Sequence, residues 1–180
     1  MMWTKGKLIK QQDYKVFKVM TTQFTYQSET SEFYQIEAPH WINIIARSKD
    51  DIIMIHQYRI GIEDYSLELP GGIIEEQDII AAGMRELEEE TGYTGTPELI
   101  GSIHPNPALF TNQLYTLYVN DAYYISTSNL ETFEDITVRR IPLSEIYIKI
   151  AHGEITNALT LASLMQLMSR YPHLFDCSND

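Results

Sequence analysis

The sequence is poor in cysteine and in long apolar runs. Cys177 is its single cysteine, so no disulfide can form within the chain, which suits a reducing compartment. No stretch approaches the ~20 consecutive apolar residues that a membrane-spanning helix needs. The N-terminal residues 1–7 are not followed by the apolar run of a secretory signal. We therefore expect a cytoplasmic protein without a membrane partner.

Basic residues are also scarce, with 13 Lys and Arg against 25 Asp and Glu and a formal net charge of −12. The sequence thus lacks the broad basic surface that non-specific nucleic-acid binding requires, and we expect no nucleic-acid partner. A phosphate-bearing substrate would be repelled unless a cation lay between it and the protein. The acidity therefore favours a divalent metal, although it also fits a role in solubility alone.

The 180 residues fit one compact domain, or one domain with a small appended element. Turn residues predict turns at 30–31 and 48–51. Apolar patterns predict strands over residues 14–28, 32–38, 41–47, 51–58, 64–69, 98–103, 113–126 and 135–141. Helical spacing predicts helices over 78–91, 144–152 and 156–170. Helices between and after strands favour an α/β sandwich over an all-β barrel.

The expected helix over 78–91 carries the most informative side chains. Asp78 is suited to its N-cap, and Gly92 lies where a C-terminal cap is expected. Glu86, Glu89 and Glu90 are spaced i, i+3 and i+4, so a helix places them on one face, where unpaired carboxylates repel one another. For an arbitrary glutamate run, a solvated helix face is the commoner explanation.

Three neighbouring features favour a metal site instead. Arg85 directly precedes the run and can hold one carboxylate by two hydrogen bonds. The Pro70-Gly71-Gly72 loop offers backbone carbonyls as further ligands, and Thr91-Gly92 ends the helix just past the carboxylates. Oxygen ligands of this kind suit Mg²⁺ or Mn²⁺.

With these residues, the segment from Gly71 to Tyr93 resembles the Nudix box of the Nudix hydrolases. That pattern reads Gly, five residues, Glu, seven residues, then Arg-Glu-aliphatic-any-Glu-Glu-any-Gly-aliphatic. The stretch from Arg85 to Tyr93 matches its second half, with Tyr93 at an aliphatic position.

The first half of the box departs from the pattern. Counted from Gly71, the expected glutamate is Gln77. Counted from Gly72 it is Asp78, and the gap to Arg85 is then one residue short. We interpret this as a one-residue deletion in or near the loop. Because the missing glutamate is not usually a direct metal ligand in the family, we expect weakened support of the site rather than lost chemistry.

The resemblance extends over residues 41–164 and narrows the substrate class. The motifs Gln57-Tyr58-Arg59 and Leu67-Glu68-Leu69-Pro70 are similar to the subgroup that hydrolyses ADP-ribose and related nucleoside-diphosphate sugars. It implies that Arg59 reaches the substrate phosphates and that Glu68 supports the metal cluster. Residues 105–108 with Asn112, and residues 153–158, resemble the same subgroup.

The resemblance also implies an architecture and an assembly. We expect a Nudix-type α/β/α sandwich with a mixed β-sheet over residues 39–180 and an N-terminal β extension over residues 1–38. Members of the subgroup often pair through such an extension, so we expect a homodimer.

The activity implied is attack by water on one phosphorus of a diphosphate, with Mg²⁺ or Mn²⁺ neutralising charge and lowering the pKa of bound water. The resemblance implies that Glu86 and Glu90 are the principal metal ligands, that Glu89 is a further ligand or orients the water, that the Gly71 carbonyl completes the shell, and that Arg85 holds the cluster.

Other candidate site residues lie outside the Nudix box. Related diphosphate-sugar enzymes supply a general base from a loop before a late strand, so the resemblance implies Glu131 or Glu134 for this role. We prefer Glu134 because it lies closer to the following strand, and a solvated loop acid is nearly as good an interpretation. Trp41 and Phe110 offer rings for stacking on a base, although aromatic side chains more often belong to a core or an interface.

ADP-ribose or a related nucleotide sugar is therefore the expected substrate. Two alternatives stay open at this stage. The first is hydrolysis of a dinucleoside polyphosphate or a nucleoside triphosphate. The second is a Nudix domain that binds a nucleotide without catalysis.

Overall fold

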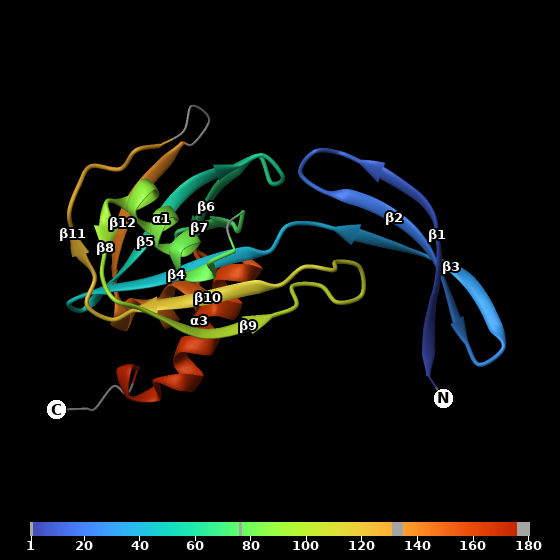
Figure 1. Cartoon of the computed structure of the whole chain (residues 1–180). Helices are drawn as coiled ribbons and strands as arrows, with labels where there is room; N and C mark the ends of the chain where they lie inside the picture. Colours follow the sequence, from blue (N-terminus) through green and yellow to red (C-terminus); the bar gives the residue numbers. More distant parts are fainter. Residues whose placement is uncertain (1, 76, 131–134, 176–180) are drawn as a thin grey trace. The chain divides into compact units, whose positions relative to one another are not determined.

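A computed structural model describes residues 2–75, 77–130 and 135–175 of the chain (Figure 1). The chain divides into two compact units. One comprises Met1–His40 and Ile103–Gln113, and the other comprises Trp41–Ser102 and Leu114–Asp180.

The first unit is a three-stranded antiparallel sheet of order β1-β2-β3, formed by β1 (Trp3–Asp13), β2 (Lys18–Tyr26) and β3 (Glu29–Glu37). The sequence did not predict β1, because this strand is exposed along its whole length and so has no alternation of apolar and polar residues. The turn predicted at 30–31 is wrong, because the chain reverses at Gln27 and Ser28, where Gln27 has a φ of 57°.

The excursion over residues 103–113 belongs to the same unit. Phe110 forms a parallel bridge with Ile36 of β3. The buried Asn112 donates from its side-chain amide to the Pro39 carbonyl over 2.8 Å. Asn112 therefore joins this excursion to the end of the N-terminal sheet segment.

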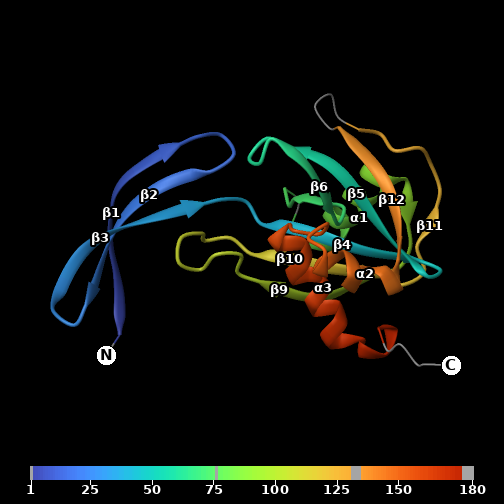
Figure 2. The same ribbon diagram turned by 180° about the vertical axis from the view of Figure 1, so that it is seen from behind.

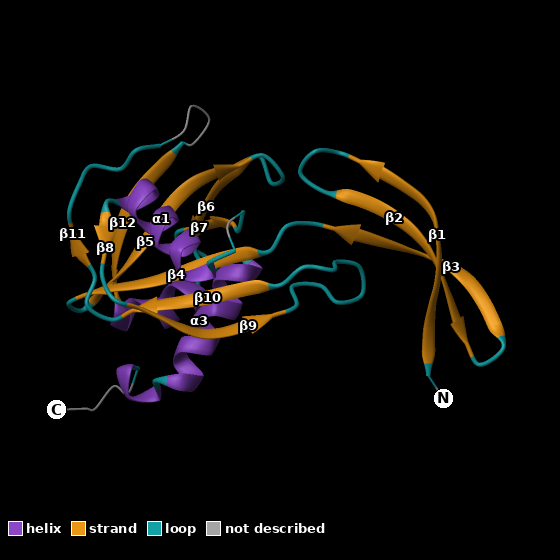
Figure 3. Cartoon of the chain, in the orientation of Figure 1, coloured by secondary structure: helices purple, strands orange, loops and turns teal. Residues whose placement is uncertain are grey.

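The second unit contains a seven-stranded mixed sheet of order β12-β5-β4-β10-β9, in which β6 pairs with β5 and β7 with β4 (Figure 3). β4 and β10 run parallel, whereas β4 is antiparallel to β5 and β7, and β5 to β6 and β12. The strands are β4 (Trp41–Ser48), β5 (Asp51–Arg59), β6 (Asp64–Glu68), β7 (Gly71–Ile73), β9 (Pro97–Ile103), β10 (Leu114–Val119) and β12 (Ile136–Pro142). A two-stranded sheet joins β8 (Tyr93–Thr94) to β11 (Tyr123–Tyr124). The single strand predicted over 113–126 is therefore broken into β10 and β11.

Helices cover both faces of this sheet. α1 (Ile79–Thr91) packs Leu87 against a core that includes Ile42, Ile44 and Ile53. On the other face, α2 (Ile146–Ala151) and α3 (Ala158–Arg170) pack against a core that includes Ile45 (Figure 2). The expected α/β/α sandwich with a mixed sheet is confirmed. No helix in the part of the chain described is long and apolar enough to cross a membrane.

Two predicted helix starts are wrong by about a turn or less. Residues Leu143–Glu145 form a 3-10 turn, so α2 begins at Ile146 and not at the predicted Ser144. α3 begins at Ala158, because the Asn157 side chain accepts hydrogen bonds from two backbone N–H groups of the first turn. Short 3-10 turns often precede helices and have no distinct sequence pattern.

The strands β4 and β5 separate along their length. They pair with each other over Ala46–Ser48, close to their shared hairpin. The first residues of β4, from Trp41 to Asn43, pair with β7 instead, and the last residues of β5 pair with β6. The segment joining β6 to β7 therefore lies where the two central strands diverge.

Candidate active site

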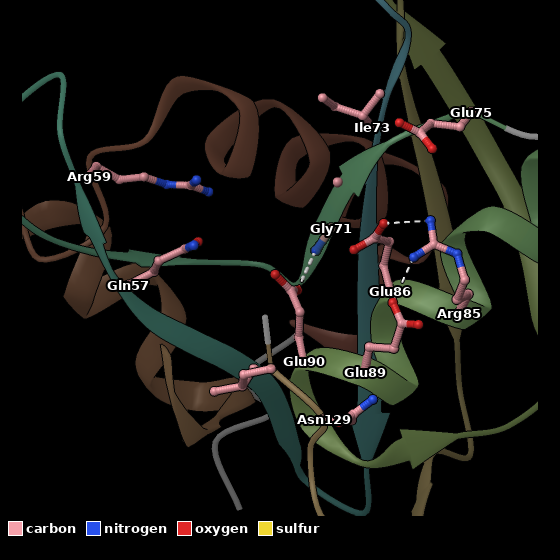
Figure 4. A pocket seen from close by; sticks show the side chains of 12 residues that line it. Gln57, Arg59, Gly71, Ile73, Glu75, Arg85, Glu86, Glu89, Glu90 and Asn129 are labelled. Atoms are coloured by element: carbon pink, nitrogen blue, oxygen red, sulfur yellow. Dashed lines mark hydrogen bonds and ion pairs between the residues drawn. The ribbon is translucent and has the colours of Figure 1, made fainter. Parts of the chain in front are cut away.

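A cavity of about 530 Å³ lies beside this divergence (Figure 4). Its size is within the range of small-molecule sites. It is lined by residues of β5, β7, α1 and the segment after β11, namely Gln57, Arg59, Gly71, Gly72, Ile73, Glu75, Arg85, Glu86, Glu89, Glu90, Asn129 and Leu130.

α1 supplies the acidic side of the cavity. The helix begins after Asp78, whose carboxylate accepts from the backbone N–H groups of Ile80 and Ala81, and ends at Gly92, which has a φ of 74°. Both predicted caps are confirmed. Asp78 therefore caps the helix. It is also one of the two positions at which the sequence departs from the box pattern of the family.

Arg85 joins two of the carboxylates on this helix. Its Nη1 donates to Glu89 over 2.6 Å and its Nη2 to Glu86 over 2.8 Å. The sequence suggested that this guanidinium would hold one carboxylate by two hydrogen bonds, whereas the structure shows it bridging two. Charge-assisted hydrogen bonds of this kind fix the positions of side chains that would otherwise repel one another.

Glu90 is the most deeply placed of the three acids. It is 4% exposed, and its Oε2 accepts a hydrogen bond from the backbone N–H of Gly71 over 2.8 Å. The adjacent Gly72 leaves room for another carboxylate, because a Cβ added there would lie 2.6 to 2.8 Å from the carboxylate atoms of Glu86. The two glycines therefore let the backbone of β7 approach the acidic face of α1.

These residues fit a divalent cation by their chemistry. Carboxylate oxygens and the backbone carbonyl oxygens of nearby glycines are hard ligands, which Mg²⁺ and Mn²⁺ prefer. Over residues 2–75, 77–130 and 135–175, no three His, Cys, Asp or Glu side chains already converge as a metal cluster. Glu86 and Glu89 are instead turned toward Arg85. These two carboxylates would exchange part of their bonding with Arg85 for bonding to the ion.

Arg59 lies on the β5 side of the cavity, across from the acids of α1 (Figure 4). Its Nε donates to Oε1 of Glu68 over 3.1 Å, and its Nη2 donates to Oε2 over 2.6 Å. The Glu68 side chain is only 5% exposed, whereas that of Arg59 is 44% exposed. Glu68 therefore directly fixes the orientation of Arg59, and this two-point geometry holds a guanidinium rigidly.

Trp41 lines a second cavity of about 270 Å³, which shares Arg59 and residues 71–73 with the first. Glu68 also lines this smaller cavity. The structure thus brings the predicted Gly71, Arg85, Glu86, Glu89, Glu90 and Arg59 around one cavity and Trp41 and Glu68 around its neighbour. The predicted base Glu134 lies outside the described residues.

Several lining residues were not among the predicted site residues. Gln57 precedes Arg59 by two positions, so strand alternation places both on one face and would have indicated it. Asn157 and Leu159 reach the smaller cavity from the start of α3. Nothing local in the sequence indicates this, because their position depends on how α3 packs across the sheet.

Comparison with known proteins gives matches to short stretches of curated relatives. The chain is 37% identical over 68 residues to an ADP-ribose pyrophosphatase of Saccharomyces cerevisiae, covering 37% of this chain and 27% of that protein. It is 38% identical over 73 residues to an ADP-sugar pyrophosphatase of Mus musculus, covering 38% and 34%. It is 34% identical over 94 residues to a methanol dehydrogenase activator of Bacillus methanolicus, covering 51% and 50%. The matched stretches thus span half or less of each relative.

A solved structure described as an ADP compounds hydrolase superposes with a TM-score of 0.84, covering 96% of both chains at 18% sequence identity. At that identity the likeness supports the fold. The family model described as the NUDIX domain matches residues 37–159, which is more than half of the chain and includes α1 and the loop before it. The chain therefore belongs to the NUDIX domain family.

Proposed function

We propose that this protein is a metal-dependent hydrolase that cleaves the diphosphate bond of a nucleoside diphosphate linked to a second moiety, with ADP-ribose or a related nucleotide sugar as substrate. The observation that carries the proposal is the cavity itself, where three carboxylates of α1 lie opposite the guanidinium of Arg59. Two relatives named as ADP-ribose and ADP-sugar pyrophosphatases support the substrate class.

Glu86, Glu89 and Glu90, with the backbone of Gly71, would hold Mg²⁺ or Mn²⁺ on the α1 side of the cavity. A bound ion there neutralises phosphate charge and lowers the pKa of a coordinated water. Arg85 keeps the carboxylates in place. Arg59, held by the buried Glu68, binds phosphate oxygens in a fixed orientation, so that the diphosphate lies between the guanidinium and the acids.

We propose Glu134 as the general base that accepts a proton from the attacking water. Asn129 and Leu130, shortly before it in the chain, line the cavity, which supports this assignment. A Glu134→Gln variant tests it. We expect kcat to fall by about 10² to 10⁴, as for other lost acid–base groups, and an unchanged kcat would remove Glu134 from the mechanism.

The function is tested by incubating the full chain with ADP-ribose and Mg²⁺ and identifying the products. We expect AMP and ribose 5-phosphate, and a loss of activity of several orders of magnitude in a Glu89→Gln, Glu90→Gln double variant. Gly61→Ala is the matched control, since it lies in a turn with open space around it. Activity confined to dinucleoside polyphosphates or nucleoside triphosphates would refute the substrate class. Binding without turnover would refute hydrolysis.

We also propose that the chain forms a homodimer through its three-stranded sheet. Exposed aromatic rings gather there, with the Trp3 ring 4.9 Å from Tyr26 and 5.6 Å from Phe33 between centroids. Exposed aromatic groups of this kind are typical of interaction surfaces. Sedimentation of the wild type and a Phe33→Glu variant tests this, and we expect a dimer that dissociates in the variant. A monomeric wild type would refute the proposal.

A further inference from the structure

The segment of residues 69–71, which leads from the end of β6 into the first residue of β7, is hydrogen-bonded to a different element at each residue. The backbone N–H of Leu69 donates to Oγ1 of Thr160 in α3 over 3.2 Å. The carbonyl of Pro70 accepts from the backbone N–H of Ile44 in β4 over 2.8 Å. The N–H of Gly71 then donates to Glu90 of α1 over 2.8 Å. A path of consecutive backbone groups therefore connects α3 to a carboxylate of the site.

A second contact of α3 supports the other side of Gly71. Ser163 lies one turn after Thr160, so both residues share the face of α3 that packs against the sheet. Its Oγ is 3.1 Å from the donor Nδ2 of Asn43, and Asn43 is the partner of Gly71 in the pairing of β4 with β7. Thr160 is 1% exposed and Ser163 is 0% exposed.

Burial alone does not account for these hydroxyls. The same face of α3 carries Leu164 and Leu167, which are fully buried in the apolar core. An apolar side chain at position 160 would bury as well, but it would leave the Leu69 N–H without an acceptor, and a buried unpaired donor is costly. Thr160 therefore holds the backbone at Leu69, and Ser163 holds Asn43, the strand partner of Gly71.

We propose that Thr160 is a positioning residue that orients Glu90 through the backbone of Leu69 and Gly71. Thr160 fixes the start of the segment, Pro70 is held by β4, and the Gly71 N–H fixes one oxygen of the Glu90 carboxylate. Fixing one oxygen sets the direction of the other, so α3 controls the geometry of a side chain on the opposite face of the sheet. This inference rests on the proposed role of Glu90 as a metal ligand.

The test compares Thr160→Val, which keeps the shape but removes the hydroxyl, with Thr160→Ser, which keeps it. Thr22→Val in β2 is the matched control, because Thr22 is 1% exposed and its hydroxyl has no hydrogen-bond partner within the described residues. Two quantities are measured in each variant. The first is the hydrogen-exchange rate of the Gly71 amide without metal, and the second is the dissociation constant of Mn²⁺ by electron paramagnetic resonance.

We expect Thr160→Val to accelerate Gly71 exchange and to weaken Mn²⁺ binding by roughly threefold to tenfold, the effect of one lost hydrogen bond. Thr160→Ser and Thr22→Val should stay near the wild type in both quantities. If Thr160→Val fails to fold, Ser163→Ala serves instead and should change both in the same direction by a smaller factor.

Wild-type exchange and wild-type Mn²⁺ affinity in Thr160→Val would overturn the inference, as would equal effects in Thr22→Val. These results are separable from the proposed function. A wild-type protein that binds Mn²⁺ and hydrolyses no diphosphate would refute hydrolysis, while slower exchange and tighter Mn²⁺ binding in the wild type than in Thr160→Val would still support the role of Thr160.

Discussion

Gly71→Ala and Gly72→Ala should affect different properties of the protein. Gly71→Ala should mainly lower the stability of the fold, whereas Gly72→Ala should mainly lower the activity. A Cβ on Gly71 would lie 2.0 Å from the backbone carbonyl oxygen of Ile42. That oxygen belongs to β4, so relief requires a backbone shift of roughly 1 Å in a close-packed strand pair. A Cβ on Gly72 would instead meet the carboxylate of Glu86, which can rotate away.

The expected magnitudes follow from these contacts. Overpacking against backbone costs about 1 to 3 kcal/mol or more, and we expect Gly71→Ala at the upper end. For a chain of this size that loss lowers Tm by about 6 to 12 °C. Gly72→Ala should change Tm by less than about 3 °C, because only a side chain has to move. It should lower kcat/KM by about 10²-fold, because Glu86, a proposed metal ligand, is displaced by roughly 1 Å.

Thermal melting and steady-state hydrolysis of ADP-ribose measure the two effects on the same samples. Gly61→Ala is the control, since nothing lies within 4 Å of its added Cβ, and it should match the wild type in both assays. A wild-type Tm in Gly71→Ala would refute the expected clash with Ile42. Full activity in Gly72→Ala would refute the expected displacement of Glu86.

Three further substitutions test other parts of the site. Arg59→Lys replaces the two-point contact with Glu68 by a single charge, so KM for the substrate should rise about tenfold with a smaller change in kcat in steady-state assays; an unchanged KM would contradict a phosphate-binding role. Arg85→Ala removes the bridge between two carboxylates, so Tm should fall without metal and recover with Mg²⁺, whereas a fall that Mg²⁺ does not reverse would contradict the fit of the cluster to a cation. Asp78→Ala removes two capping bonds of α1 and should cost about 1 kcal/mol in urea unfolding, and no loss would show that the cap is dispensable.

Much of the site could be predicted because its signals are local. The spacing of Glu86, Glu89 and Glu90 determines a shared helix face, and Asp78 and Gly92 mark both ends of that helix. These features depend on contacts within about a turn, so the sequence contains all the information they need. The sandwich architecture followed from the alternation of strands and helices, which is equally visible in the chain.

The parts that were missed depend on tertiary contacts. β7 was missed because Pro70-Gly71-Gly72 was interpreted as a loop, yet Gly71 and Gly72 pair with β4. The two-point bond between Arg59 and Glu68 depends on the pairing of β5 with β6, and it assigns Glu68 a direct contact that its place in the motif did not reveal. β1 has no buried face, so its sequence has no period to detect.

The excursion over residues 103–113 has a consequence for how the protein can be shortened. Because Phe110 pairs with Ile36 and Asn112 donates to Pro39, this excursion completes the N-terminal unit from within the later part of the chain. Removing residues 1–40 would thus take away the contacts of Phe110 and Asn112 and expose the amide of Asn112, which is buried in the full chain. A truncated chain that keeps only the second unit should therefore also have residues 103–113 replaced by a short polar turn.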